Sequence, residues 1–169
     1  INEPEFLKAV DDVEDIFIEI EWATIFFFLS LFILVGALEE VGVMEYLASK
    51  LLSITGGNMT MTMIVILWVS AIASSVLDNI PFVATMIPLI KNFGVMSGLD
   101  VTPLWWALAL GACLGGNGTL VGASANVIVS GLLARHGQKL SFGYYFKIGF
   151  PLMILSIVIS TVYLLVFII

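Results

Sequence analysis

Long uncharged stretches alternate with short polar segments along this chain. Residues 22–38 are uncharged for 17 positions, and residues 150–169 are uncharged for 20. An α-helix rises about 1.5 Å per residue, so about 20 apolar residues cross the hydrocarbon core of a bilayer. We therefore predict transmembrane helices at residues 22–38 and 144–169.

Between these spans, residues 41–55 follow a different pattern. Apolar side chains recur there at helical spacing, while polar ones gather on another face: Met44, Leu47, Ala48, Leu51 and Leu52 against Glu45, Ser49 and Ser53. Such a pattern is typical of a helix that lies on a membrane surface. We predict a short amphipathic surface helix at residues 41–55.

The next apolar stretch is interrupted by a charge and a proline. Residues 60–77 are uncharged, Asp78 and Asn79 follow, and residues 81–90 are apolar again. Pro81 would cost about 3 kcal/mol inside a helix but suits the first turn of a new one. A second arm of about ten residues is too short to cross a bilayer. We predict a re-entrant hairpin over residues 60–91, with its polar tip at membrane depth.

A broken helix is predicted further on. Residues 101–134 are uncharged for 34 positions, yet glycine fills four of the eight positions 115–122. Glycine disfavours a helix interior, so we predict a broken transmembrane helix over 103–134 that is unwound at 115–121. Unwound backbone at membrane depth is tolerated only where protein buries it or where it lines a wet cavity. The break therefore indicates a functional site.

The composition places these helices in a membrane. Hydrophobic residues make up 60% of the chain and charged residues 11%, and the mean hydropathy is +1.13. A soluble domain carries about 25% charged residues. We predict an all-α polytopic membrane fold in a single membrane domain over residues 1–169, with three crossing elements, one re-entrant hairpin and one surface helix.

The net charge of −7 reflects one end of the chain. Eight of the thirteen acidic residues fall within residues 1–21, so we predict a polar acidic leader at residues 1–20. The chain has no basic patch, and nucleic acid is not an expected partner. It begins at Ile1 without a signal-peptide pattern, so we expect a piece of a longer chain.

Basic residues predict the orientation. Arg135, Lys139 and Lys147 cluster with His136 between the broken helix and the last span, whereas Lys50 and Lys91 stand singly. Basic loops face the cytoplasm. We therefore predict a cytoplasmic N-terminus and an external C-terminus, in the cell (inner) membrane.

Asp78 is the first candidate for ion binding. A carboxylate at membrane depth costs about 2.5–3.5 kcal/mol, so its presence there needs a reason. We predict a Na⁺ or H⁺ site in which Asp78 supplies charge, while the Asn79 amide and free carbonyls supply oxygen ligands. The alternative is that Asp78 is only the N-cap of the second arm.

The unwound stretch is the second candidate. Helix ends at a break expose carbonyl oxygens that suit a cation and N–H groups that suit an anion. Asn117, Gly118 and Thr119 are the predicted ligands, and Ser124 and Asn126 extend the site. Asp78, Asn79, Asn117 and Thr119 are our Na⁺ candidates. The alternatives are a glycine-rich kink for close helix packing and, for Ser124 and Asn126, simple helix–helix hydrogen bonding.

Enzymatic chemistry is not expected. An intramembrane aspartyl protease needs two membrane aspartates, and only Asp78 is available. One histidine and one cysteine cannot form a metal cluster. The glycine-rich stretch lacks the P-loop lysine and a preceding strand. We predict no catalytic residues and no cofactor other than Na⁺ or H⁺ as coupling ion.

Both candidate sites carry a family resemblance. Residues 74–88, SSVLDNIPFVATMIP, resemble the hairpin of the ion transporter superfamily, and residues 115–126, GGNGTLVGASAN, resemble its unwound transport helix. This superfamily contains citrate and other divalent-anion symporters, arsenite permeases, sodium–proton antiporters and the melanosomal P protein. The segments Ile20-Glu21-Trp22, Phe26-Phe27-Phe28 and Gly36-Ala37-Leu38-Glu39 are similar to the permease and P-protein branch.

The resemblance implies half of a two-repeat transporter. Members contain two inverted repeats, each with a hairpin and a broken helix, and this chain matches the second, C-terminal one. The tip at Asp78 and Asn79, with Thr85 nearby, would form half of the site together with residues 117–119. The N-terminal repeat of the parent protein would supply the other half. The expected partners are a small ion as substrate, the lipid bilayer and a second copy in a homodimer.

One departure from the family bears on the substrate. Dicarboxylate symporters have Ser-Asn-Thr at the hairpin tip, whereas Asp78-Asn79-Ile80 is similar to the antiporter and P-protein branches. A fixed negative charge repels an anion unless a cation or proton neutralises it. We expect an ion-coupled secondary transporter that works by alternating access. A sodium–proton antiporter, a passive ion channel and a non-transporting interaction module are the alternatives.

Overall fold

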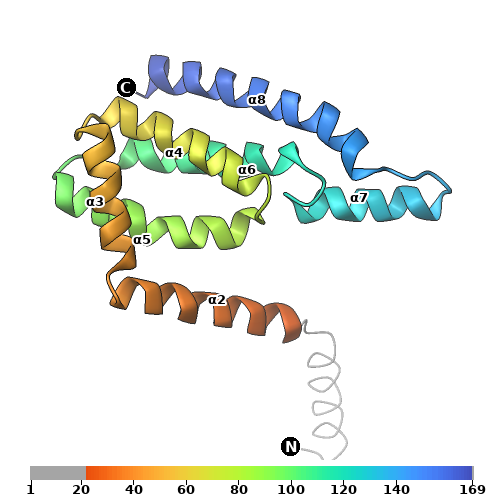
Figure 1. Cartoon of the computed structure of the whole chain (residues 1–169), viewed down its shortest axis with the longest axis horizontal. Helices are drawn as coiled ribbons and strands as arrows, with labels where there is room; N and C mark the ends of the chain where they lie inside the picture. The colour runs from red at the N-terminus through yellow and green to blue at the C-terminus, as the bar shows by residue number, and fades with distance from the viewer. Residues whose placement is uncertain (1–21, 169) are drawn as a thin grey trace, which may run out of the picture. The chain divides into compact units, whose positions relative to one another are not determined.

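The structure is a computed structural model that describes residues 22–168. The acidic leader predicted at residues 1–20 lies outside the described residues. Helices occupy most of the described part of the chain, which contains no strand (Figure 1). They are α2 (Trp22–Glu40), α3 (Val43–Thr55), α4 (Met59–Ser74), α5 (Asn79–Ser97), α6 (Thr102–Gly115), the 3₁₀-helix η1 (Gly116–Gly118), α7 (Ser124–Arg135) and α8 (Phe142–Phe167). The all-α prediction is confirmed.

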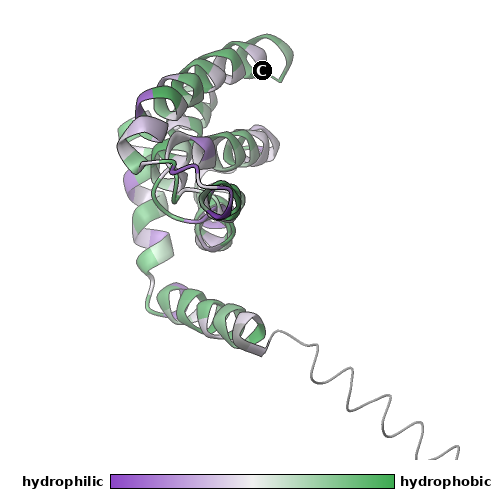
Figure 2. Ribbon diagram, turned by 90° about the vertical axis from the view of Figure 1, so that its right-hand side faces the viewer, coloured by the Kyte–Doolittle hydropathy of each residue, from purple (hydrophilic) through white to green (hydrophobic). Residues whose placement is uncertain are grey.

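The chain divides into two compact units, residues 1–34 and residues 35–169. The described part of the first unit is the apolar beginning of α2, whose side chains are mostly exposed. The second unit contains all the remaining helices and the candidate sites. Hydrophobic residues cover most of the visible surface of α8, whereas hydrophilic residues interrupt α3 (Figure 2). That α3 lies on a membrane surface stays a prediction.

Two of the described helices, α5 and α8, are long and apolar enough to cross a membrane by length and composition. A third span is counted if α2 and α3 form one bent pair. The predicted ten-residue second arm of the hairpin is wrong in length, because α5 has 19 residues. The helix continues past Lys91 and ends only at Gly98, whose φ of +68° is the left-handed conformation that glycine adopts most readily. Whether α4 and α5 re-enter on one side of a membrane stays a prediction.

The core of the second unit lies between α4 and α6, with α3, α5 and α8 packed around them. Its largest fully buried apolar side chains come from four helices: Met63 and Leu67, Ile90 and Phe93, Leu104, and Met153, Ile157 and Leu164. The indole N–H of Trp68 on α4 donates to Thr161 Oγ1 on α8 at 3.2 Å. None of the described residues of α7 is buried.

Helices α4 and α6 run side by side in the same direction (Figure 1). Two glycines one turn apart on α6 allow this close approach. A Cβ at Gly111 would lie 2.5 Å from the carbonyl oxygen of Leu67, and a Cβ at Gly115 would lie 2.6 Å from the Cα of Ala71. Small residues in a helix seam let membrane helices pack backbone to backbone. Both helices therefore end together, next to the break.

Asp100 accepts hydrogen bonds from the first residue of α6. Its Oδ1 accepts hydrogen bonds from the Thr102 hydroxyl at 2.7 Å and from the Thr102 backbone N–H at 3.0 Å. These two bonds, the hydroxyl bond first, favour the carboxylate and lower the pKa of Asp100 below its usual 3.8. The loop that carries Asp100 is exposed and lies outside the candidate spans.

We expect Asp100→Ala to lower the unfolding temperature of the full-length protein slightly at neutral pH. A lowered folded-state pKa contributes stability above the unfolded value, and this contribution is lost as the pH falls through the folded pKa. The difference between wild type and variant should therefore shrink below pH 3.8. Thermal unfolding at several pH values checks this; a difference that persists at the lowest pH would contradict it.

Candidate ion-binding site at the helix break

The predicted break in the long apolar segment is confirmed as a break in the helix. Helix α6 ends at Gly115, η1 covers three residues, and α7 begins at Ser124. The Ser74 hydroxyl at the end of α4 donates to the carbonyl oxygen of Ala112 in the last turn of α6, at 2.6 Å. The site is therefore built where two parallel helices end.

The turn after α4 is tied to the break through Thr119. The hydroxyl of Thr119 donates a short hydrogen bond to the carbonyl oxygen of Ser75 and accepts one from the Gly122 N–H at 3.1 Å. Thr119 is buried, with 4% of its surface exposed. Its hydroxyl therefore links the hairpin turn to the unwound backbone through two hydrogen bonds.

Asn126 holds the unwound backbone from the other side. Its amide Nδ2 donates to the carbonyl oxygens of Gly116 at 3.0 Å and Thr119 at 3.1 Å. One side chain on the first turn of α7 thus bridges both ends of the four-residue segment 116–119, which contains η1 and the residue after it. Asn126 and Thr119 hold the geometry of the break.

Carbonyl oxygens gather around Gly122. A Cβ built there would lie 2.7 Å from the Ser75 oxygen, 2.8 Å from the Gly116 oxygen and 3.0 Å from the Ser74 oxygen. Only a glycine fits among these three oxygens. The C-terminal end of a helix carries about half a negative charge, and α4 and α6 bring two such ends together. The break is therefore an electronegative place lined with hard oxygen atoms, the ligands that Na⁺ prefers.

The other predicted site residues do not take part in this cluster. Asp78 is exposed at the N-cap of α5, yet its carboxylate makes no side-chain capping bond in the described part of the chain. Asn79 is half-buried in the first turn of α5, and the Thr85 hydroxyl donates to Phe82 of its own helix at 2.7 Å. Ser124 is exposed at the first position of α7. No described hydrogen bond joins Asp78, Asn79, Thr85 or Ser124 to the break.

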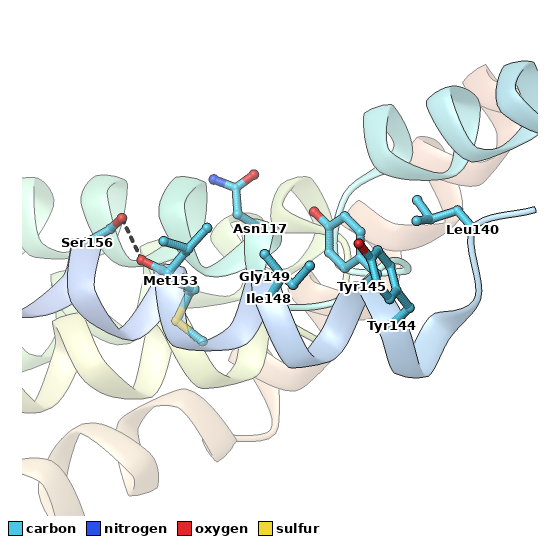
Figure 3. Close-up of a pocket in the computed structure, with 9 residues that line it drawn as sticks. Asn117, Leu140, Tyr144, Tyr145, Ile148, Gly149, Met153 and Ser156 are labelled. Atoms are coloured by element: carbon cyan, nitrogen blue, oxygen red, sulfur yellow. Dashed lines mark hydrogen bonds between the residues drawn. The ribbon is translucent and has the colours of Figure 1, made fainter. Parts of the chain in front are cut away.

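Asn117 and Gly118 face α8. Gly118 is buried, and a Cβ there would lie 2.9 Å from the Met153 Cε atom. Asn117 is exposed and lines a cavity of about 400 Å³ along α8. Tyr144, Tyr145 and Leu152 of α8 also line this cavity. Figure 3 shows Asn117 beside Gly149, with the two tyrosines toward Leu140.

The sequence of this chain is similar to those of known transporters. Residues 6–111, more than half of the chain, match the citrate transporter family. The chain belongs to the citrate transporter family. This confirms the resemblance to the ion transporter superfamily that the hairpin and unwound-helix strings carry. Members of this family are transporters, and together with the apolar helices this makes the chain an integral membrane protein.

Proteins similar to this member of the citrate transporter family come from animals and bacteria. It is 46% identical to the P protein of Sus scrofa and 44% identical to that of Homo sapiens, in both over 95% of this chain and 20% of the relative. It is 47% identical to an uncharacterized transporter of Mycobacterium tuberculosis, over 86% of this chain and 34% of the relative. The chain thus spans about a fifth to a third of the length of these relatives.

Sequence reasoning missed several residues of this family member's site. Ser74 and Ser75 belong to the segment 74–88 that resembles the family's hairpin. A sequence does not show that the Ser74 hydroxyl donates a hydrogen bond or that the Ser75 carbonyl accepts one. Tyr144 and Tyr145 follow a basic loop and carry no sign that they line the cavity beside Asn117. The serine pair at the end of an otherwise apolar helix was the one available signal.

Thr119 offers a test of this fastening. We expect Thr119→Val to lower the stability of the full-length protein by about 1–3 kcal/mol, because the Ser75 carbonyl and the Gly122 N–H would lose a buried partner. Thr119→Ser keeps the hydroxyl and is the matched control. Thermal unfolding of the three proteins measures the difference; equal stability of the valine and serine variants would contradict the role.

Proposed function

We propose that this chain forms half of the transport site of an ion-coupled secondary transporter. The observation that carries the proposal is the meeting of two helix C-termini and three carbonyl oxygens at Gly122, fastened to the hairpin turn by Thr119. Membership of the citrate transporter family supports it. In such transporters, coupling ions bind at unwound backbone and half-helix ends.

The coupling ion is Na⁺ or H⁺ in this proposal. The carbonyl ends of α4 and α6 favour a cation, and Asp78 lies three residues after Ser75 in the same turn. Its free carboxylate neutralises a bound Na⁺ or takes up a proton. Asn79 and Asn117 supply amide oxygens, and Thr119 and Asn126 keep the backbone oxygens in place.

The transported ion binds on the opposite side of the turn. Helices α5 and α7 begin just after the hairpin turn and the break, and in this proposal the transported ion lies at their positive N-terminal ends. An anion placed there is attracted both by these ends and by the bound cation. Because the bound cation attracts the anion, the flux of the transported ion is linked to the flux of the cation.

The rest of the protein completes the site. We place an N-terminal repeat of the parent protein against this half, and the whole as a homodimer in the cell (inner) membrane. The α7–α8 loop with its basic residues faces the cytoplasm, as does the N-terminus of the chain, and the C-terminus lies outside. Alternating access then follows from movement of the hairpin and the broken helix as one unit.

Uptake by the full-length protein in proteoliposomes tests this function. Labelled candidate substrates, among them citrate, arsenite and chloride, are offered under an imposed Na⁺ or H⁺ gradient. We expect accumulation above the external concentration with one of the two gradients. Flux that only equilibrates, whichever gradient is imposed, would contradict coupled transport and favour a passive channel.

A further inference from the structure

The segment between α7 and α8 carries an unbalanced positive charge. Arg135, Lys139 and Lys147 fall within thirteen residues, whereas residues 101–169 contain no aspartate or glutamate. These cations therefore have no acidic partner in their own part of the sequence. A cluster of this kind beside apolar helices attracts anions at a membrane surface.

A cavity opens at this loop. It measures about 400 Å³, and both polar and apolar residues line it: Gln138, Lys139 and Ser141, and Leu133, Leu140 and Tyr144. Lys139 is the cationic side chain of this lining. A lining of this mixed kind suits a ligand that has an anionic end and a hydrocarbon end.

The apolar side continues along α8. The cavity beside Asn117 shares Leu140 and Tyr144 with the loop cavity and extends to Leu152 and Ser156. Twelve residues separate Tyr144 from Ser156, which is about 18 Å along a helix at 1.5 Å per residue. The two cavities meet at Leu140 and Tyr144, and the residues that line the second extend along α8 as far as Ser156 (Figure 3).

Aromatic side chains mark the same end of α8. The rings of Phe142 and Phe146 stack with their centroids 6.2 Å apart, and those of Phe146 and Phe150 at 4.8 Å. Tyr144 is exposed between them. Tyrosine and tryptophan gather where a membrane helix meets the headgroup layer, and Tyr144 and Tyr145 lie at this end. The basic loop therefore lies at the depth of lipid phosphates.

We propose that the α7–α8 loop binds one anionic membrane phospholipid. Its phosphate lies at Lys139 with Gln138 and Ser141, and one acyl chain follows α8 past Tyr144 toward Leu152. The lipid site does not depend on which ion is transported.

The test is lipid binding by the purified full-length protein in a neutral detergent. Short-chain phosphatidylglycerol, short-chain phosphatidylcholine and inorganic phosphate are titrated separately, and the unfolding temperature reports binding. We expect phosphatidylglycerol to bind most tightly, and Lys139→Gln to weaken its binding about fivefold, the effect of one basic residue at an anionic headgroup. The matched control Lys91→Gln removes an exposed lysine that lines neither cavity and should leave binding unchanged.

Three results would overturn the proposal. Equal affinity for phosphatidylglycerol and phosphatidylcholine would mean that the headgroup charge is not recognised. Inorganic phosphate that binds as tightly as phosphatidylglycerol would mean an anion site without a lipid path. Equal losses in Lys139→Gln and Lys91→Gln would mean a general charge effect rather than a site at this loop.

Discussion

Gly115→Ala is expected to destabilise the full-length protein by about 1–3 kcal/mol, the usual cost of forcing an extra methyl group into a packed interior. The added Cβ would meet the backbone of Ala71, with its Cα only 2.6 Å away and its carbonyl oxygen closer still. The backbone atoms of a packed helix cannot move aside as a flexible side chain can. The overlap therefore separates α4 from α6 in the turn where both helices end, and the Ser74 to Ala112 hydrogen bond is lost with it.

Gly131→Ala is the matched control for this variant. Gly131 also lies within a helix, α7, but a Cβ there meets nothing within 4 Å. The same replacement should leave stability unchanged or raise it by about 0.5–1 kcal/mol, since alanine is the better helix former. Thermal unfolding and uptake of both variants are compared with wild type. A Gly115→Ala protein as stable and active as Gly131→Ala would show that the close seam between α4 and α6 is not needed.

Asp78→Asn is expected to abolish cation-driven accumulation while leaving the protein folded. The Asp78 carboxylate is exposed and makes no capping bond, and asparagine is as good an N-cap as aspartate. The variant therefore removes a charge and little else. Uptake under the driving gradient should fall to the level of protein-free liposomes.

Asp100→Asn separates this effect from a general loss of charge. Asp100 is another exposed loop carboxylate, and an asparagine there keeps an oxygen that can accept from Thr102. We expect Asp100→Asn to retain gradient-driven uptake. Accumulation by Asp78→Asn at the wild-type rate would exclude Asp78 from the coupling site.

The helices themselves were predictable because apolar length and glycine content determine them locally. Four glycines within residues 115–122 place the break between α6 and α7 to within about two residues of the observed ends, the usual uncertainty of helix ends. The length of α5 was not predictable in the same way. Lys91 ended the uncharged run, but one lysine does not end a helix, and the left-handed Gly98 does.

The candidate site was only partly predictable, because residue types do not reveal which oxygen a hydroxyl meets. Asn117, Thr119 and Asn126 stood out as polar residues in an apolar segment. The structure gives Thr119 and Asn126 internal partners and leaves Asn117 facing the cavity. The carbonyl oxygens around Gly122 depend on the packing of α4 against α6, a long-range contact between residues about 45 positions apart.

Glycines for close helix packing were the alternative interpretation of the broken segment, and the contact between α4 and α6 supports it. Gly111 and Gly115 serve close helix packing, as small residues do in membrane bundles. Gly122 differs, since the atoms that surround it are oxygens from two helix ends. Close helix packing and the proposed ion binding therefore involve different glycines of the same segment.

Cation binding by the full-length protein without substrate tests the central claim most directly. The unfolding temperature is measured as Na⁺ replaces choline at constant ionic strength, at several pH values, for wild type and Asp78→Asn. A ligand at a hundredfold excess over its Kd stabilises a protein by about 2.7 kcal/mol, which such a titration detects. We predict that either Na⁺ or protons stabilise the wild type and that Asp78→Asn loses the response. No response in the wild type to either ion, or an equal response in both proteins, would contradict a coupling site at the hairpin turn and the helix break.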